Sequence, residues 1–193
     1  MSEVPVFQSE LGLDMHFDLM NCPENLPVSL FLMTPEQVTD DYVSWLNSSE
    51  INQYLESRFV AHTVESTRAF VSSTMASPDT LFFGIKSKAL NKHVGNVKLG
   101  PIDRYHGTCD VGILIGDKTA WGMGVATCTI SAVSEIAKNH LGLRKLTAGC
   151  YISNEGSRKA FMKAGFVVEG VRPGQFLLNG KPEDLVLLGQ ILK

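Results

Sequence analysis

Short apolar runs, separated by polar or glycine-containing segments, recur along the chain and predict β-strands. The polar connections at 87–92 and 101–107 are short enough for three successive strands to form an antiparallel meander. Asn179-Gly180 is the strongest hairpin signal, because both residues readily adopt the positive φ angles of a tight turn. The predicted strands cover residues 28–33, 80–86, 93–99, 108–115, 145–151, 167–171 and 185–192.

Between these strands, apolar residues return at helical spacing and predict amphipathic helices. Thr34, Pro35 and Gln37 form a capping box with proline at the first helical position, so we expect the first helix to begin there. The predicted helices cover 34–46, a short segment ending at 55, 64–75, 127–140 and 157–164. Alternating strands and helices without a repeat or low-complexity linker predict an α+β domain built on one mixed sheet.

Composition narrows the class of protein. The chain has 193 residues, enough for one domain with a sizeable core. Its formal net charge of −3 and lack of a Lys/Arg run argue against nucleic-acid binding. No apolar run approaches the roughly 20 residues that a bilayer-spanning helix needs, so no membrane association is expected. The first residues lack a basic segment followed by an apolar one, as in a secretory signal, so a cytoplasmic enzyme is predicted.

The four cysteines, Cys22, Cys109, Cys128 and Cys150, show neither CxxC spacing nor clustered histidines. Neither a metal site nor a disulfide framework is therefore indicated. Cys150 raises the alternative of a covalent acyl-cysteine. A small buried hydrophobe on a strand is the favoured interpretation, since no histidine stands near it in sequence to generate a thiolate.

The segment Trp121-Gly122-Met123-Gly124-Val125-Ala126 is the most informative motif. It joins a predicted strand to a predicted helix, and two glycines allow close approach of the backbone to an anion. The unpaired N–H groups and the positive dipole end of the following helix would point at the same place. The motif predicts a phosphate cradle, although tight packing of a strand on a helix gives a similar pattern.

Three further motifs follow in order: Asn154-Glu155-Gly156-Ser157, Lys163-Ala164-Gly165-Phe166, and Glu169-Gly170 with Arg172. Together with the glycine turn, this set resembles the GNAT superfamily of acyl-CoA-dependent N-acyltransferases. It is most similar to the branch with the Rim-type ribosomal-protein acetyltransferases and many bacterial amino-sugar acetyltransferases. The resemblance is strong from Val94 onward and looser over 28–84. We therefore expect an acyltransferase domain at 28–193, preceded by an extension at 1–27.

The resemblance implies a mostly antiparallel sheet that splays apart between its fourth and fifth strands, with helices on both faces. It implies acetyl-CoA as the acyl donor, with the pantetheine arm bonded to the strand backbone and the pyrophosphate resting on the glycine turn. Asn154 would bond the pantetheine, or else serve only as a turn residue that caps the next helix. The implied cofactor-binding residues are Ile113, Leu114, Ile115, Trp121, Gly122, Met123, Gly124, Val125, Ala126, Asn154 and Ser157.

Catalysis would need donors for an oxyanion, a proton for the leaving thiolate and an acceptor for the amine's proton. A backbone N–H at the end of 111–115 would polarise the thioester carbonyl, and Ser157 would hydrogen-bond the sulfur, unless it is an ordinary first-turn serine. Two family positions differ here: Phe161 stands where many members have a tyrosine acid, and Gln175 where Rim-type enzymes have a glutamate.

The carboxylates left to accept the amine's proton are therefore Asp110 and Glu169. Asp110 opens the strand that leads into the cofactor site. Glu169 is alternatively a structural partner of Arg172. His106 has a suitable intrinsic pKa, but an ordinary solvated loop histidine is the favoured interpretation.

The resemblance places the acceptor between segment 47–62 and the hairpin at 175–182. Tyr54, Glu56, Arg58 and Phe59 would give this wall aromatic surface and charge. We expect the primary amine of a small molecule, such as an amino sugar, as substrate. A peptide N-terminus, a non-catalytic acyl-CoA-binding module and a nucleotide-phosphate enzyme remain alternatives. A homodimer is compatible with the sequence.

Overall fold

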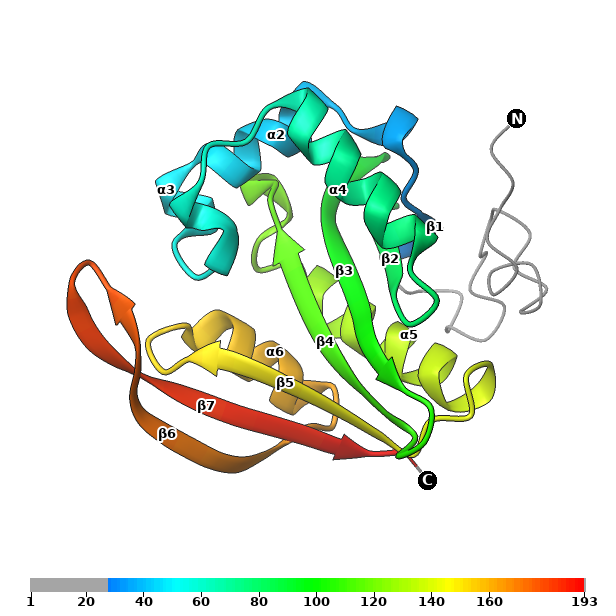
Figure 1. The fold of residues 1–193 in the computed structure, drawn as a ribbon, viewed down its shortest axis with the longest axis vertical. Coiled ribbons are helices and arrows are strands. Elements are labelled where there is room, and N and C mark those ends of the chain that lie inside the picture. The colour runs from blue at the N-terminus through cyan, green and yellow to red at the C-terminus, as the bar shows by residue number, and fades with distance from the viewer. Residues whose placement is uncertain (1–27, 193) are drawn as a thin grey trace.

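The computed structural model describes residues 28–192 (Figure 1). The predicted N-terminal extension, with Cys22, lies outside the described residues. Seven strands form one sheet in the order β1-β2-β3-β4-β5-β7-β6. All neighbouring strands are antiparallel except β4 and β5, which are parallel, so the predicted mixed α+β sheet is confirmed. The strands are β1 (Val28–Leu32), β2 (Leu81–Ser87), β3 (Lys92–Asp103), β4 (Thr108–Ile115), β5 (Lys145–Tyr151), β6 (Val167–Leu178) and β7 (Lys181–Ile191).

The predicted bounds of β4 and β5 match the structure, whereas β3 and β6 run further than expected. β3 contains Gly100-Pro101 and β6 contains Pro173-Gly174, and both strands continue past these pairs. The pairing instead shifts register between Leu99 and Ile102 in β3, and between Arg172 and Phe176 in β6. Such bulges let a strand absorb residues that cannot join the regular ladder.

The hairpin predicted at Asn179-Gly180 is confirmed. Asn179 has a φ of 51° and Gly180 a φ of 77°, as a two-residue turn of type I′ requires. This turn joins β6 to β7 and fixes their register at the tip, where Leu178 pairs with Lys181.

The first predicted helix is wrong as a continuous element. Pro35–Gln37 forms a short 3-10 helix, η1, and α2 (Asp40–Asn47) begins separately. Val38 adopts an extended conformation, and the Thr39 side chain accepts a hydrogen bond from the Tyr42 N–H, which makes Thr39 a second N-cap. The other helices are α3 (Ser49–Asn52), η2 (Glu56–Phe59), α4 (Val64–Ala76), η3 (Lys118–Ala120), α5 (Val125–Asn139) and α6 (Glu155–Lys163).

Helices cover both faces of the sheet, as expected (Figure 1). On one face, α5 and α6 pack over a core that includes the fully buried Phe83, Ile130 and Val133. On the other face, α2 and α4 bury Trp45 and Val71 against the first strands. None of the described helices combines the length and apolar character needed to span a membrane.

The sheet splays between β4 and β5, as the resemblance implies. The two strands pair over only three residue pairs, from Thr108 with Lys145 to Asp110 with Thr147. Beyond Asp110 the strands diverge (Figure 1). Divergence leaves unpaired backbone groups along the facing edges of both strands, and this opening positions the candidate site.

Candidate active site

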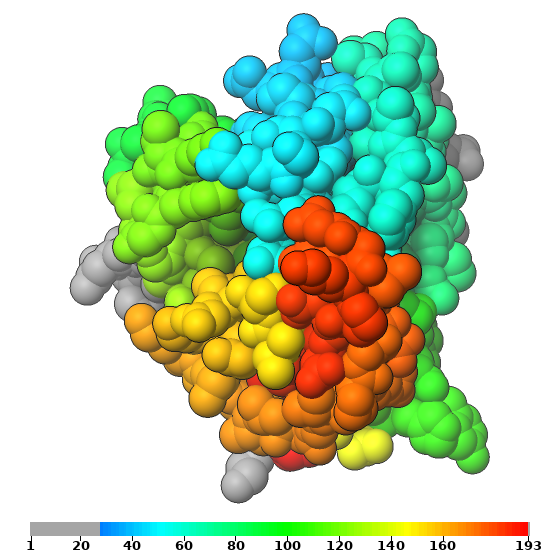
Figure 2. Space-filling model, turned by 90° about the vertical axis from the view of Figure 1, so that its left-hand side faces the viewer, coloured from blue at the N-terminus to red at the C-terminus, as the bar shows by residue number. Residues whose placement is uncertain are grey.

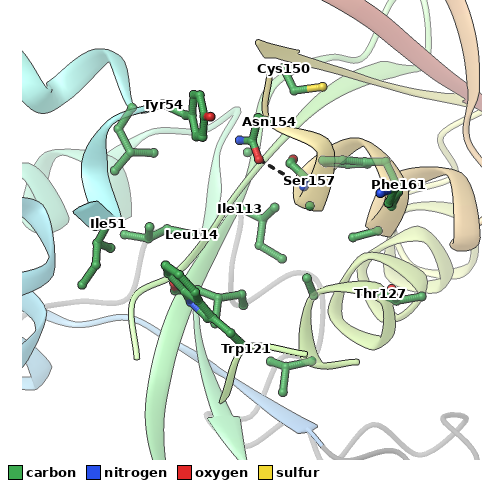
Figure 3. Close-up of a pocket in the computed structure, with 18 of the residues that line it drawn as sticks. Ile51, Tyr54, Ile113, Leu114, Trp121, Thr127, Cys150, Asn154, Ser157 and Phe161 are labelled. Atoms are coloured by element: carbon green, nitrogen blue, oxygen red, sulfur yellow. Dashed lines mark hydrogen bonds between the residues drawn. The ribbon is translucent and has the colours of Figure 1, made fainter. Parts of the chain in front are cut away.

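A cavity of about 670 Å³ occupies the opening between β4 and β5 (Figure 3). Residues from α3, the segment before η2, β4, the glycine turn, the end of β5 and α6 line it. Ile113, Leu114, Trp121, Asn154 and Ser157 of the predicted cofactor set are all among them. The structure thus brings most of the predicted binding residues to one cavity.

The glycine turn presents open backbone to this cavity. Gly122 and Gly124 have φ values of 75° and 79°, in the left-handed region that favours glycine. A Cβ added at either position would meet no other atom within 4 Å, so open space lies in front of the turn. Gly124 is also the N-cap of the 15-residue helix α5.

The start of α5 offers unpaired donors. Its first intrahelical bond runs from the Cys128 N–H to the Gly124 carbonyl, at 3.0 Å. The N–H groups of residues 125–127 therefore have no acceptor within the helix. Donors at the positive end of a helix, facing open space, suit a phosphate group.

The backbone of β4 points alternately to β3 and to the cavity. The Gly116 N–H donates to the Val94 carbonyl at 2.9 Å, and the regular register then directs the backbone groups of Leu114 to β3 as well. The backbone groups of Ile113 and Ile115 face the open edge. This register argues against a backbone contact from Leu114 to the pantetheine, while the Leu114 side chain lines the cavity.

Trp121 connects the glycine turn to the end of β4. Its indole Nε1 donates to the Ile115 carbonyl at 2.9 Å, and the side chain remains 46% exposed. The Ile115 carbonyl is thus already used. Ile113 is the residue of the predicted trio that keeps both backbone groups directed at the cavity.

Asn154 and Ser157 lie at the start of α6, beside the cavity (Figure 3). The Asn154 Oδ1 accepts a hydrogen bond from the Ser157 N–H at 3.2 Å, so Asn154 is the N-cap of α6. The alternative role as a capping residue is therefore observed, while its contact with a pantetheine stays a prediction. Ser157 presents its hydroxyl from the first turn of the helix.

Phe161 and Cys150 also line the cavity, and neither supplies acid-base chemistry. Phe161 is buried and meets Phe166 edge-on, with ring centroids 4.9 Å apart. Burial raises the pKa of the Cys150 thiol, which disfavours a thiolate. Cys150 fits its predicted role as a small buried hydrophobe.

At the other end of the cavity, three polar side chains form a hydrogen-bonded chain. The Tyr151 hydroxyl accepts from Arg58 Nη2 at 2.8 Å and donates to Glu56 Oε1 at 2.6 Å. Burial and the Glu56 carboxylate raise the pKa of Tyr151. The sequence placed Glu56 and Arg58 in the acceptor wall but missed Tyr151, whose only local signal is its position at the end of a predicted strand.

Arg58 also ties η2 to the β6–β7 hairpin. Its Nη2 donates to the Leu177 carbonyl at 2.9 Å and its Nη1 to the Leu55 carbonyl at 2.8 Å. The tip of the hairpin lies against this cyan segment in Figure 2. Leu177 to Gly180 line a neighbouring hollow with Phe59 rather than the main cavity. Of the two predicted walls, segment 47–62 borders the cavity, and the hairpin packs behind that segment.

A family model described as "Acetyltransferase (GNAT) domain" matches residues 30–167. The chain belongs to the GNAT acetyltransferase family. A GNAT relative, the Bacillus subtilis (strain 168) protein YjcK, provisionally named an N-acetyltransferase, is 30% identical over 127 residues, covering 64% of this chain and 70% of YjcK. YwnH of the same strain, provisionally named a phosphinothricin acetyltransferase, is 39% identical over 88 residues, covering 46% of this chain and 53% of YwnH. The match thus spans about half the length of YwnH.

Solved GNAT structures share the fold. Spermidine N-acetyltransferase from Vibrio cholerae, in complex with CoA and spermine, superimposes with a TM-score of 0.77 at 18% identity, covering 86% of this chain and 96% of that one. Mycobacterium smegmatis RimJ, in complex with CoA-disulfide, gives a TM-score of 0.74 at 17% identity, covering 85% and 81%. Identity at this level supports the architecture alone.

Acetyl-CoA, the acyl donor of GNAT enzymes, fits the groups that the cavity presents. The glycine turn and the first N–H groups of α5 would hold its phosphates, and the Ile113 carbonyl would accept a hydrogen bond from a pantetheine amide. The open space in front of Gly122 and Gly124 is the observation that supports this fit.

The two carboxylates predicted as proton acceptors lie outside the cavity. Asp110 is in the paired part of β4, where its Oδ1 accepts a hydrogen bond from Thr147 Oγ1. Glu169 pairs with Lys145 Nζ at 2.7 Å, rather than with Arg172. Since neither side chain lines the GNAT cleft, their positions do not support the predicted role. The sequence could not reveal that Asp110 lies in the part of β4 that is still paired with β5.

Proposed function

We propose that the protein transfers an acetyl group from acetyl-CoA directly to the primary amine of a small molecule, with both substrates bound at once. The observation that carries this proposal is the continuity of the cavity. One opening between β4 and β5 reaches from the phosphate-binding turn to Glu56 and Tyr151. Donor and acceptor can therefore meet without a covalent enzyme intermediate, for which the buried Cys150 is unsuited.

Bound acetyl-CoA supplies a thioester carbonyl that a neutral amine attacks. The Ile113 N–H, which faces the open edge of β4, is the donor available to the carbonyl oxygen as negative charge develops on it. Ser157, on the first turn of α6, is the hydroxyl available to the departing sulfur. A fixed donor aimed at developing charge is typically worth 10²-fold or more in rate, so these two groups account for a substantial part of catalysis.

Cavity size favours a small acceptor. A volume of about 670 Å³ lies within the usual range for small-molecule sites, and the reactive end of acetyl-CoA must share it. Little room is left for an extended peptide. Amino sugars are among the small amines that fit this description. A protein N-terminus is the competing acceptor class.

The test has two stages. Calorimetric titration with acetyl-CoA, with ATP as control, should give one binding event for acetyl-CoA and a much weaker one for ATP. Release of free CoA thiol is then followed with glucosamine, spermidine, tyramine and an N-terminal peptide. Turnover of a small amine supports the proposal, and turnover of the peptide alone points to a protein acetyltransferase. Acetyl-CoA binding without thiol release from any amine would leave a non-catalytic binding module.

A further inference from the structure

Two carboxylates line the cavity among the described residues, and they differ in how they are engaged. Glu50 pairs with Lys118, which stands just before the glycine turn, so Glu50 belongs to the donor end of the cavity. Glu56 pairs with Arg58 at 3.4 Å and accepts from Tyr151, but both contacts use Oε1, and its side chain is 60% exposed. The second oxygen of Glu56 therefore remains accessible to a bound molecule. Glu56 is the carboxylate that the cavity offers to an acceptor.

The nearest cation to Glu56 is fully engaged. Arg58 is 12% exposed at its side chain, and its two Nη atoms donate to the Leu55 and Leu177 carbonyls, the Tyr151 hydroxyl and Glu56. These four contacts use the four Nη hydrogens of a guanidinium. A carboxylate or phosphate of an incoming acceptor would have to displace one of these contacts to bond an Nη atom of Arg58.

The cations that line the cavity are Lys159 and Lys163 of α6. Lys159 already pairs with Glu155 at 2.6 Å. The acceptor end thus presents the exposed carboxylate of Glu56, while its partner Arg58 is largely buried. A positively charged or neutral acceptor is favoured there, and a second negative charge is repelled.

The hydrogen-bond chain fixes the direction of the Glu56 contact. Arginine only donates, so the Tyr151 oxygen must accept from Arg58 and send its own hydrogen to Glu56. Stacking of Tyr151 on Phe176, at 4.6 Å between centroids, holds the ring in place. Tyr54 approaches the same ring at 5.5 Å, which adds an aromatic surface beside the carboxylate. Aromatic faces next to a carboxylate suit an ammonium group on an apolar stem.

We infer that Glu56 binds the acceptor amine and accepts its proton, and that the acceptor is a primary amine with no carboxylate next to the reacting nitrogen. Tyr151 and Arg58 are positioning residues for Glu56. This inference rests on the proposed acetyl transfer, and it names the acceptor class and the base of the same site. The relative YwnH carries the name of an enzyme for phosphinothricin, an amino acid, so the inference separates this chain from that acceptor class.

The proton balance is simple. An acceptor bound as an ammonium first loses one proton, through Glu56 to solvent, which frees the lone pair of its nitrogen. This lone pair forms the new C–N bond, the C–S bond breaks, and its electron pair leaves with the sulfur. The nitrogen becomes strongly acidic as the C–N bond forms, so a carboxylate suffices to take its proton. The thiolate acquires a proton by way of Ser157 or water, and the exposed Glu56 returns its proton to solvent.

The experiment compares matched acceptors that differ by one carboxylate. The pairs are tyramine with tyrosine and agmatine with arginine, each assayed for kcat/KM by CoA thiol release. In the wild type, the member without the carboxylate should be preferred at least about tenfold, because like charges would otherwise meet at Glu56. Glu56→Gln should lower kcat with the preferred amine about 100-fold, as expected for loss of a general base, and bring the ratio within each pair towards one.

A second variant, Tyr151→Phe, separates structure from chemistry. Tyr151→Phe keeps the ring stacking and removes the hydroxyl, so kcat should fall less than in Glu56→Gln while the acceptor KM rises. Calorimetric affinity for acetyl-CoA should stay within about twofold in both variants, which shows that each remains folded with an intact donor site.

Three results would overturn the inference alone: equal kcat/KM within the pairs, preference for the amino acids, or unchanged kcat in Glu56→Gln. Absence of thiol release with every member of every pair, while acetyl-CoA still binds, would instead overturn the proposed acetyl transfer to small amines, and the inference with it.

Discussion

Replacing Gly124 with valine tests the phosphate site, and the accompanying loss of protein stability can be calculated. A Cβ at this position meets no protein atom within 4 Å outside the neighbouring residues, so open space receives the new side chain. The substitution lowers the free energy of unfolding because the φ of 79° is unfavourable for a residue with a Cβ. The penalty is about 1–2 kcal/mol, and somewhat more for a β-branched residue. In a protein of this size, each kcal/mol lowers Tm by about 2–4 °C, so the variant remains folded.

The same side chain fills the space in front of the first N–H groups of α5. Losing one charge-assisted hydrogen bond weakens acetyl-CoA binding by about 1.5–3 kcal/mol. At about 1.4 kcal/mol per tenfold change, the Kd measured by calorimetry should rise at least roughly 10- to 150-fold.

Gly142→Val is the matched control. Gly142 follows the other end of α5, has a φ of 63°, and likewise has open space where a Cβ would lie. Its valine variant should lose a similar amount of thermal stability without affecting acetyl-CoA affinity. Equal affinities of the two variants for acetyl-CoA would refute the assignment of the phosphate site.

Three other expectations concern single side chains. Ser157→Ala should lower kcat about 10- to 100-fold and leave acetyl-CoA affinity unchanged, since the backbone bond to Asn154 persists; steady-state kinetics with unaltered kcat would exclude a role for the hydroxyl. Glu169→Gln should remove up to about 1 kcal/mol of stability through its Lys145 pair while kcat stays within about twofold, and a large kcat loss would restore Glu169 as a base. Burial raises the pKa of Cys109 from 9.0 to about 12, so the unfolded chain loses this proton first and stability should fall as pH rises between these values. Thermal melts over that range should show a shallower decline in Cys109→Ala, and an unchanged slope would contradict this cause.

Elements specified by local chemistry were predictable from the sequence. The Asn179-Gly180 turn follows from the φ preferences of two residues, and it is confirmed. The bounds of β4 and β5 follow from compact apolar runs and are correct. The break between η1 and α2 was missed because both Thr34 and Thr39 can serve as an N-cap. The sequence alone does not show which residue begins the longer helix.

The two ends of the cavity also differ in how far they could be predicted from the sequence. The glycine turn is encoded within six consecutive residues, so its position and its two positive φ angles could be anticipated. The Arg58–Tyr151–Glu56 chain joins residues 93 and 95 positions apart, and Arg58 reaches Leu177 across 119 positions. Such contacts depend on how β5, η2 and the hairpin pack together. Local sequence patterns do not predict this packing.

A crystal structure of the protein with acetyl-CoA is the most direct test of the central claim, that the opening between β4 and β5 is the acyl-donor site. The account predicts the pyrophosphate on the backbone N–H groups of residues 122–126 and the pantetheine along the free edge of β4 at Ile113. Acetyl-CoA bound at another surface, or with its phosphates away from the start of α5, would contradict it.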